Sequence, residues 1–102
     1  MVFGASGDPS RNGGVMVDYV YGTDLTLGNG EDELVLSSEE RVIDEVVYSD
    51  DSPWVDPGGA SLTLAPSARD ASANDDPTSW CEAVSPYGEG DLGTPGAAND
   101  RC

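Results

Sequence analysis

The chain has 102 residues, enough for one domain, and its 20 acidic residues against four arginines give a formal net charge of −16. This charge repels phosphate backbones and anionic lipid surfaces, so the composition argues against direct nucleic-acid binding and membrane binding. The absence of His and Lys removes the usual proton carriers near neutral pH, imidazole zinc ligands and amine nucleophiles. We therefore expect a non-catalytic protein with no bound cofactor.

Hydrophobic residues make up 37% of the chain, which also contains 13 Gly and 7 Pro. This mixture favours short strands joined by tight turns over long helices. No stretch reaches the roughly 18 apolar residues of a membrane span, so no membrane insertion is expected. The residues after Met1 lack the basic and apolar regions of a signal peptide, so an export signal is expected to lie outside this chain.

The predicted elements begin with a loop at residues 4–14, in which nearly every residue is a turn former. Residues 15–21 are rich in β-branched and aromatic side chains and predict a strand. After a turn, residues 25–27 predict a second, short strand that ends at the turn of residues 28–30.

Residues 32–38 predict the next strand, with Leu34 and Leu36 on the face that points to the core. A short connection leads into a strand at residues 41–49, and the two together predict a hairpin.

The second half of the chain begins with a loop at residues 50–59 and a strand at residues 60–64. Residues 67–79 form an acidic polar loop without apolar periodicity, and residues 80–81 begin a last short strand. Residues 86–102 are a Gly- and Pro-rich closing segment. About five strands with turns every 8–12 residues predict an all-β sandwich.

Cys81 and Cys102 are the only cysteines. An even number of cysteines in a small, turn-rich, acidic chain indicates one disulfide and an oxidising compartment, and the alternative is two unpaired thiols. A bridge would close a loop of about 20 residues, worth about 3 kcal/mol in the chain-entropy model.

A series of short segments runs through the chain and ends in the run Gly-Asp-Leu-Gly-Thr-Pro-Gly-Ala-Ala-Asn at residues 90–99. The segments that precede this final run are residues 13–15, 25–29, 33–36, 43–48, Trp54 with 57–62, 80–81 and 86–88. Together these segments resemble the lamin-tail domain in its bacterial extracellular form. The resemblance implies an all-β, immunoglobulin-like β-sandwich.

The start of the family pattern has no counterpart in this chain. Family members begin with an acidic-aromatic strand segment and a Leu-x-Gly-Trp segment, whereas Val2 and Phe3 match only the end of the strand that follows. Residues 1–102 are therefore expected to form a single lamin-tail-like domain that lacks its N-terminal strands. Such a domain has an unpaired strand edge, through which it could associate with itself or accept a strand from another chain.

The resemblance brings no catalytic residues with it. It implies a non-catalytic interaction or structural module of a secreted or cell-surface protein, with a protein or glycan as partner. The alternatives are a calcium-stabilised extracellular domain and a fragment accessory to a secreted hydrolase or nuclease.

Two groups of polar side chains are candidate calcium ligands, because calcium prefers carboxylate and amide oxygens. They are Asp70, Asn74 and Asp76 in the polar loop, and Asp50, Asp51 and Asp56 in the preceding loop. The EF-hand pattern is not met, because its sixth position requires Gly and holds Asp75 here. The alternative interpretation of both groups is a solvated acidic surface.

Three other side chains need an explanation. Asp44 shares a strand face with apolar neighbours, so its carboxylate needs hydrogen-bond donors, which Arg41 or backbone amides could supply. Trp54 lies in a Pro-flanked loop and is the candidate for a partner contact. Trp80 is expected to pack over the disulfide.

Overall fold

The computed structural model describes all 102 residues and contains four separate two-stranded sheets and one turn of 3-10 helix. The strands are β1 (Phe3–Gly4), β2 (Tyr19–Val20), β3 (Glu31–Ser38), β4 (Arg41–Ser49), β5 (Leu62–Leu64), β6 (Trp80–Glu82), β7 (Pro86–Tyr87) and β8 (Asp91–Leu92), and the helical turn η1 is Pro77–Ser79. The predicted all-β class is confirmed. The strand pairs do not join into two packed sheets, so the immunoglobulin-like sandwich stays a prediction. The single helical turn is far too short to cross a membrane.

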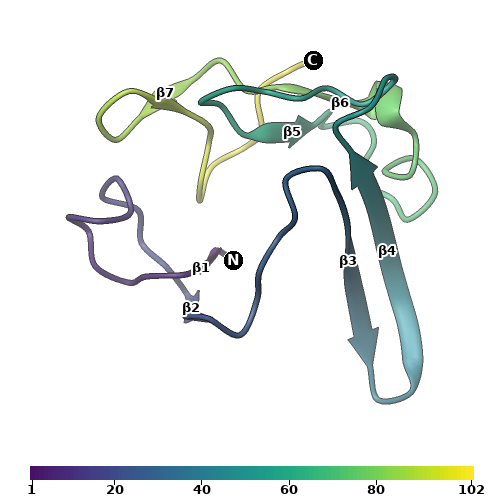
Figure 1. Cartoon of the computed structure of the whole chain (residues 1–102), viewed down its shortest axis with the longest axis horizontal. Coiled ribbons are helices and arrows are strands. Elements are labelled where there is room, and N and C mark those ends of the chain that lie inside the picture. The colour runs from purple at the N-terminus through teal and green to yellow at the C-terminus, as the bar shows by residue number, and fades with distance from the viewer.

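The hairpin of β3 and β4 is the longest element and stands out from the rest of the chain in Figure 1. Its antiparallel register runs from the pair of Glu31 and Ser49 to the pair of Ser38 and Arg41. A register shift between Leu36 and Ser37 marks a β-bulge near the tip. The structure thus confirms the predicted hairpin, with almost the predicted boundaries.

The strands β5 to β8 lie together beyond the base of the hairpin (Figure 1). An isolated bridge between Ala60 and Leu92 links the two antiparallel pairs, and the Ser61 N–H donates to the Leu92 carbonyl at 2.9 Å. The closing segment after Pro86 therefore contains a strand pair, which the sequence analysis did not predict.

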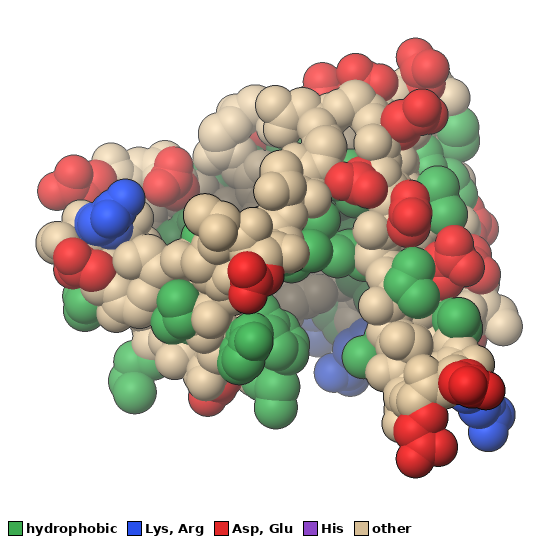
Figure 2. Space-filling model, turned by 60° about the horizontal axis from the view of Figure 1, so that its bottom comes forward, with side chains coloured by type: hydrophobic (Ala, Val, Ile, Leu, Met, Phe, Trp, Pro, Cys, Tyr) green, Lys and Arg blue, Asp and Glu red, His purple; other side chains and the backbone are tan.

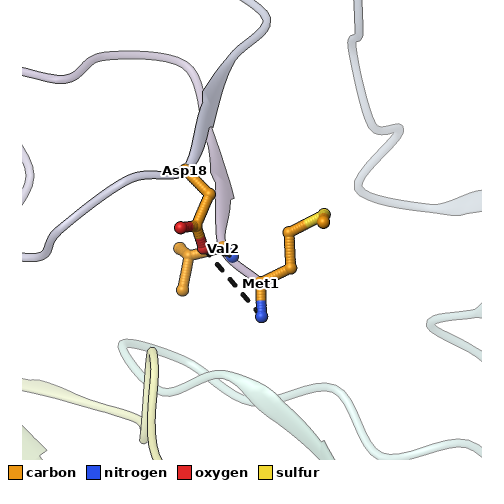
Figure 3. A network of polar contacts seen from close by, with 3 residues as sticks. All are labelled: Met1, Val2 and Asp18. Carbon is orange, nitrogen blue, oxygen red and sulfur yellow. Dashed lines mark hydrogen bonds and ion pairs between the residues drawn. The ribbon is translucent and has the colours of Figure 1, made fainter.

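The N-terminal part contains the parallel pair of β1 and β2. Asp18 holds the first residues against β2, because its Oδ2 accepts the Val2 N–H at 2.7 Å and lies 3.9 Å from the Met1 amino group (Figure 3). The rings of Phe3 and Tyr19 meet edge to face, with their centroids 5.9 Å apart. This part also lies against the closing segment, since a Cβ atom at Gly13 would lie 3.2 Å from the Tyr87 ring.

Two predicted strands differ from the structure. The strand expected at residues 15–21 is reduced to β2, because the Asn12 side chain bonds both the N–H and the C=O of Val15. Such local side-chain bonds compete with strand pairing. Residues 25–27 form no strand, since no neighbouring segment pairs with them.

Very little of the chain is buried. Only five residues are buried, and none of them has a large side chain: Thr63, Ala68, Asn74, Ala83 and Gly93. The accessible surface is 7331 Å² for a mass of 10.6 kDa, whereas a compact monomer of this mass exposes about 5,500 Å². The radius of gyration is 14.0 Å, against about 13 Å for a compact domain of this length. Large apolar side chains therefore remain on the surface.

Candidate functional site

A groove of about 480 Å³ lies at the base of the hairpin. Its apolar lining includes Leu27, Leu34, Val46, Val55, Leu62 and Trp80. Asp50 and Asp56 also line the groove, whereas no Arg does. Figure 2 shows the molecule hollowed beside the hairpin, with hydrophobic side chains in the hollow and both acidic side chains and a basic side chain near it.

One face of the hairpin supplies the groove with its apolar side chains. Side chains of opposed residues share a face, and alternate residues along a strand return to it. Leu34 opposes Val46 in the register, and Leu36 follows two residues after Leu34. Leu34 is 45% exposed and Leu36 is 60% exposed, so this face continues beyond the groove without a cover. A row of apolar side chains on an open sheet face is typical of an interaction surface.

The turn before β3 closes one end of the groove. The Tyr48 hydroxyl donates to the Gly28 carbonyl at 2.8 Å, and the Gly28 N–H donates to the Asp32 carboxylate at 2.6 Å. A Cβ atom at Gly28 would lie 2.8 Å from the Glu31 carbonyl oxygen, so only glycine fits there. The sequence placed a turn at this position, and the structure shows that the turn is tied to both strands.

These contacts change two pKa values. Hydrogen bonds from the N–H groups of Gly28 and then Glu33 lower the pKa of Asp32. Partial burial raises the pKa of Tyr48, and the nearby charge of Asp32 raises it further. Asp32 therefore stays ionised and Tyr48 stays protonated at neutral pH, so this end of the groove keeps a fixed negative charge.

The outer edges of the hairpin carry no further strand. At the base of the hairpin, the Asp50 N–H donates to the Gly30 carbonyl at 2.6 Å. In an antiparallel ladder, pairs that bond inward alternate with pairs whose backbone groups face outward. The pair of Gly30 and Asp50 bonds inward, so the next pair faces outward and the pattern alternates along the hairpin. The N–H and C=O groups of β3 that point away from β4 are therefore those of Glu31, Glu33 and Val35.

Along these edges, two aspartate side chains each accept a hydrogen bond from one backbone N–H group. The Asp32 side chain accepts the N–H of Glu33 at 2.9 Å, and the Asp44 side chain accepts the N–H of Glu45 at 3.0 Å. Such bonds to the next residue's amide are available only where the amide has no partner on a neighbouring strand. Acidic side chains at open edges are also a common protection against uncontrolled pairing.

The polar loop at residues 67–79 is fastened to β4 through Asn74, which is only 7% exposed. Its side-chain amide donates to the Asp44 carboxylate at 2.8 Å, and its backbone carbonyl accepts the Trp80 indole N–H at 2.7 Å. Asp44 thus obtains its donors from Asn74 and from the Glu45 amide, and not from Arg41. The side-chain oxygen of Asn74 has no partner.

The two tryptophans lie against each other. The ring centroids of Trp54 and Trp80 are 5.9 Å apart with an interplanar angle of 47°. Trp80 and Cys81 are successive strand residues, so their side chains point to opposite faces, and the predicted packing of Trp80 over the disulfide stays a prediction. Trp54 is half-buried by its neighbour, and its predicted role as a partner contact stays a prediction.

The candidate calcium ligands are spread over separate turns. Asp70 accepts the N–H groups of Ser72 and Ala73, each at 3.1 Å, and Asp76 caps η1 by accepting the Thr78 N–H at 2.9 Å. The Thr78 hydroxyl and N–H lower the pKa of Asp76.

The second group of candidate ligands is divided as well. Asp50 and Asp56 line the groove, and Asp51 receives a bond from the Trp54 N–H on its carbonyl at 3.1 Å. The structure gathers no three acidic side chains in an arrangement that could hold a metal ion. Calcium binding therefore stays a prediction.

The disulfide between Cys81 and Cys102 is present, with the two Cα atoms 5.6 Å apart. Nearby, Asp100 accepts the N–H groups of Val84 at 2.8 Å and Ser85 at 2.9 Å. The Ser85 hydroxyl and these two amides lower the pKa of Asp100. The closing segment is therefore held to β6 by a covalent bond and by an ionised carboxylate.

The acidic charge of the chain is almost wholly uncompensated. The one ion pair joins the Met1 amino group and Asp18, and none of the four arginines pairs with a carboxylate. Arg69 instead donates from Nε to the Pro66 carbonyl at 2.9 Å. The carboxylates around the groove are thus free to attract a cationic partner.

Comparisons of the chain with protein-family models, curated proteins and solved structures return no match.

Proposed function

We propose that this chain is a non-catalytic interaction module of a secreted or cell-surface protein. In this proposal, an immunoglobulin-like sandwich of the lamin-tail type is completed when a strand from a binding partner covers the apolar face of the hairpin.

The observation that carries this proposal is the large exposed surface. The accessible area of 7331 Å² exceeds that of a compact monomer of this mass by roughly 1,900 Å². A standard protein–protein interface buries about 800 Å² on each partner. The excess area is therefore large enough for an interface with one specific partner. Within this area, the exposed apolar residues of the hairpin would contribute most to the free energy of binding if they were buried.

Two further observations support the module. The β3 edge pairs with no further strand, and of its outward backbone groups the Glu33 N–H is bonded to the Asp32 side chain, so strand addition by a peptide has an unpaired edge to use. The disulfide between Cys81 and Cys102 is typical of a protein in an oxidising compartment.

Selection of nine-residue peptides from a displayed library against the disulfide-bonded chain tests the proposal. We expect enriched peptides to carry apolar residues at every second position, since this pattern lays one apolar face on the hairpin. The selected peptides should bind the double variant Leu34→Ser/Leu36→Ser more weakly. Val84→Ser is the control, because Val84 is an exposed apolar residue outside the hairpin, at 69% exposed against 45% for Leu34 and 60% for Leu36.

Two outcomes would contradict the proposal. One is a library in which no peptide is enriched above an uncoated surface. The other is an equal loss of binding in the Val84→Ser control and in the hairpin variant, which would show that the hairpin face has no special role.

A further inference from the structure

We infer that the β3 edge of the hairpin binds a basic, extended polypeptide segment of a partner protein, in which apolar residues alternate with Lys or Arg. The inference rests on the proposed interaction function and adds to it which edge is used and what partner chemistry fits.

The first step is the choice of edge. The loop that contains Asn74 and Asp75 lies against β4, since Asn74 bonds Asp44 at 2.8 Å and Asp75 shares a surface hollow with Glu45 and Val47. No strand pairs with either outer edge, so the loop beside β4 is what distinguishes the two edges. Figure 1 shows β3 on the inner side of the hairpin, toward the rest of the chain, and β4 on the outer side. A strand added to β3 would therefore enter the hollow and extend the groove wall.

The second step is the side-chain pattern on β3. A strand added to an edge places its side chains alternately on the two faces of the sheet, beside those of its neighbour. On the groove face, β3 offers Leu34 and Leu36, which are largely exposed. On the opposite face it offers Glu31 and Glu33, which are exposed and form no ion pair, followed by the exposed Val35. The matching strand has apolar side chains on the first face and cationic side chains on the second.

The third step decides between a foreign partner and a second copy of the chain. Each copy carries a net charge of −16, and a copy paired through β3 would bring a second set of glutamates to the same edge. Like charges on adjacent strands are destabilising. A basic segment instead neutralises Glu31 and Glu33 and is attracted by Asp50 and Asp56 at the groove. Charge complementarity therefore favours the basic partner.

A synthetic nine-residue peptide of alternating Lys and Val, capped at both ends, is the probe. Its control has the same composition with the Lys and Val residues in two blocks, so that the charge is equal and the alternation is lost. Affinity is measured by calorimetry, and hydrogen exchange is followed by NMR at the outward amides of Glu31 and Val35, because the Glu33 amide is already bonded to the Asp32 side chain. We expect the alternating peptide to bind, to slow exchange at these amides and to bind more weakly as salt rises.

Two charge-reversal variants locate the site. Glu33→Lys should weaken the alternating Lys peptide about fivefold or more, because an attractive cross-strand pair becomes a repulsive one. The same variant should gain affinity for an alternating Glu and Val peptide. Glu45→Lys is the matched control, since it makes the same change on the β4 edge and should have a much smaller effect.

The outcomes separate this inference from the proposed function. Equal binding of the block control, or an equal effect of Glu45→Lys, would overturn the β3 assignment. Stronger binding of the alternating Glu peptide to the unmodified chain would overturn the basic partner chemistry, although strand addition would stand. A dimer by light scattering with protection of the same amides would assign the edge to a second copy. If no alternating peptide of any charge protects the hairpin, the interaction function itself fails.

Discussion

Replacing Asn74 by Asp should turn the attractive contact that fastens the polar loop to the hairpin into a repulsive one. The Asn74 amide now donates to the Asp44 carboxylate at 2.8 Å. A second carboxylate at this distance cannot donate when it is ionised, and it repels the first. The substitution changes few atoms, so the effect comes from charge and hydrogen bonding with little change in packing.

The size of the effect follows from this geometry. Loss of a hydrogen bond to a charged group costs about 1.5–3 kcal/mol. Repulsion between two unit charges about 4 Å apart reaches about 4 kcal/mol at an effective dielectric constant near 20. Asp44 is half-exposed, so solvent weakens the repulsion. We therefore expect Asn74→Asp to lower the free energy of unfolding by about 3 kcal/mol at pH 7.

Urea unfolding followed by tryptophan fluorescence is a suitable assay, because Trp54 and Trp80 lie against each other beside this contact. The pH dependence gives a second readout. Repulsion raises the pKa of the introduced carboxyl in the folded state, so its penalty is absent below the unfolded value of about 3.9 and grows as the pH rises. Asn74→Ala removes the donor without adding charge, so its loss should stay nearly constant over the same range.

The exchange variant Asp44→Asn/Asn74→Asp is the decisive control. It restores one amide donor and one carboxylate acceptor in reversed order, so it should recover most of the lost stability. The reasoning is refuted if Asn74→Asp and Asn74→Ala are equally stable at pH 7. It is also refuted if the exchange variant is no more stable than Asn74→Asp alone.

Three further predictions concern the closing segment and calcium. Reduction of the Cys81–Cys102 disulfide should lower the free energy of unfolding by about 3 kcal/mol, measured by urea unfolding with and without reductant; an unchanged midpoint would contradict this. Because the folded-state pKa of Asp100 is lowered, its contribution to stability is present above the unfolded pKa and is lost as the pH falls through the folded value. Asp100→Asn should therefore be less stable at neutral pH and lose less stability on acidification, whereas parallel pH profiles would exclude this role. Because no three carboxylates converge, calcium and a chelator should give equal melting midpoints, and a higher midpoint in calcium would favour the calcium-stabilised alternative.

The parts of the fold that local pattern determines were predictable from the sequence. The hairpin at residues 31–49 follows from two runs rich in Leu and β-branched residues on either side of a short polar tip. The disulfide follows from there being only two cysteines. In both cases the signal lies in neighbouring residues or in a count, so no knowledge of distant contacts is needed.

The contacts of single polar residues were not predictable in this way. Asn12 delays the start of a predicted strand by bonding both backbone groups of Val15, and Asn74 joins two segments 30 residues apart. Asparagine is common in turns, so neither position carries a distinctive signal. The paired strands β7 and β8 escaped prediction for a related reason, since two-residue strands have too few side chains to form a pattern.

The sequence by itself determined the all-β class, the hairpin, the disulfide and the strongly acidic surface, because these depend on local alternation and on composition. The tertiary structure, in which neither edge of the hairpin pairs with a further strand, determined which edge has a loop beside it. The polar loop approaches β4 through the bond of Asn74 to Asp44, and β3 is left unpaired with its leucines exposed. That outcome depends on contacts between segments distant in sequence, and alternation within one strand carries no information about them.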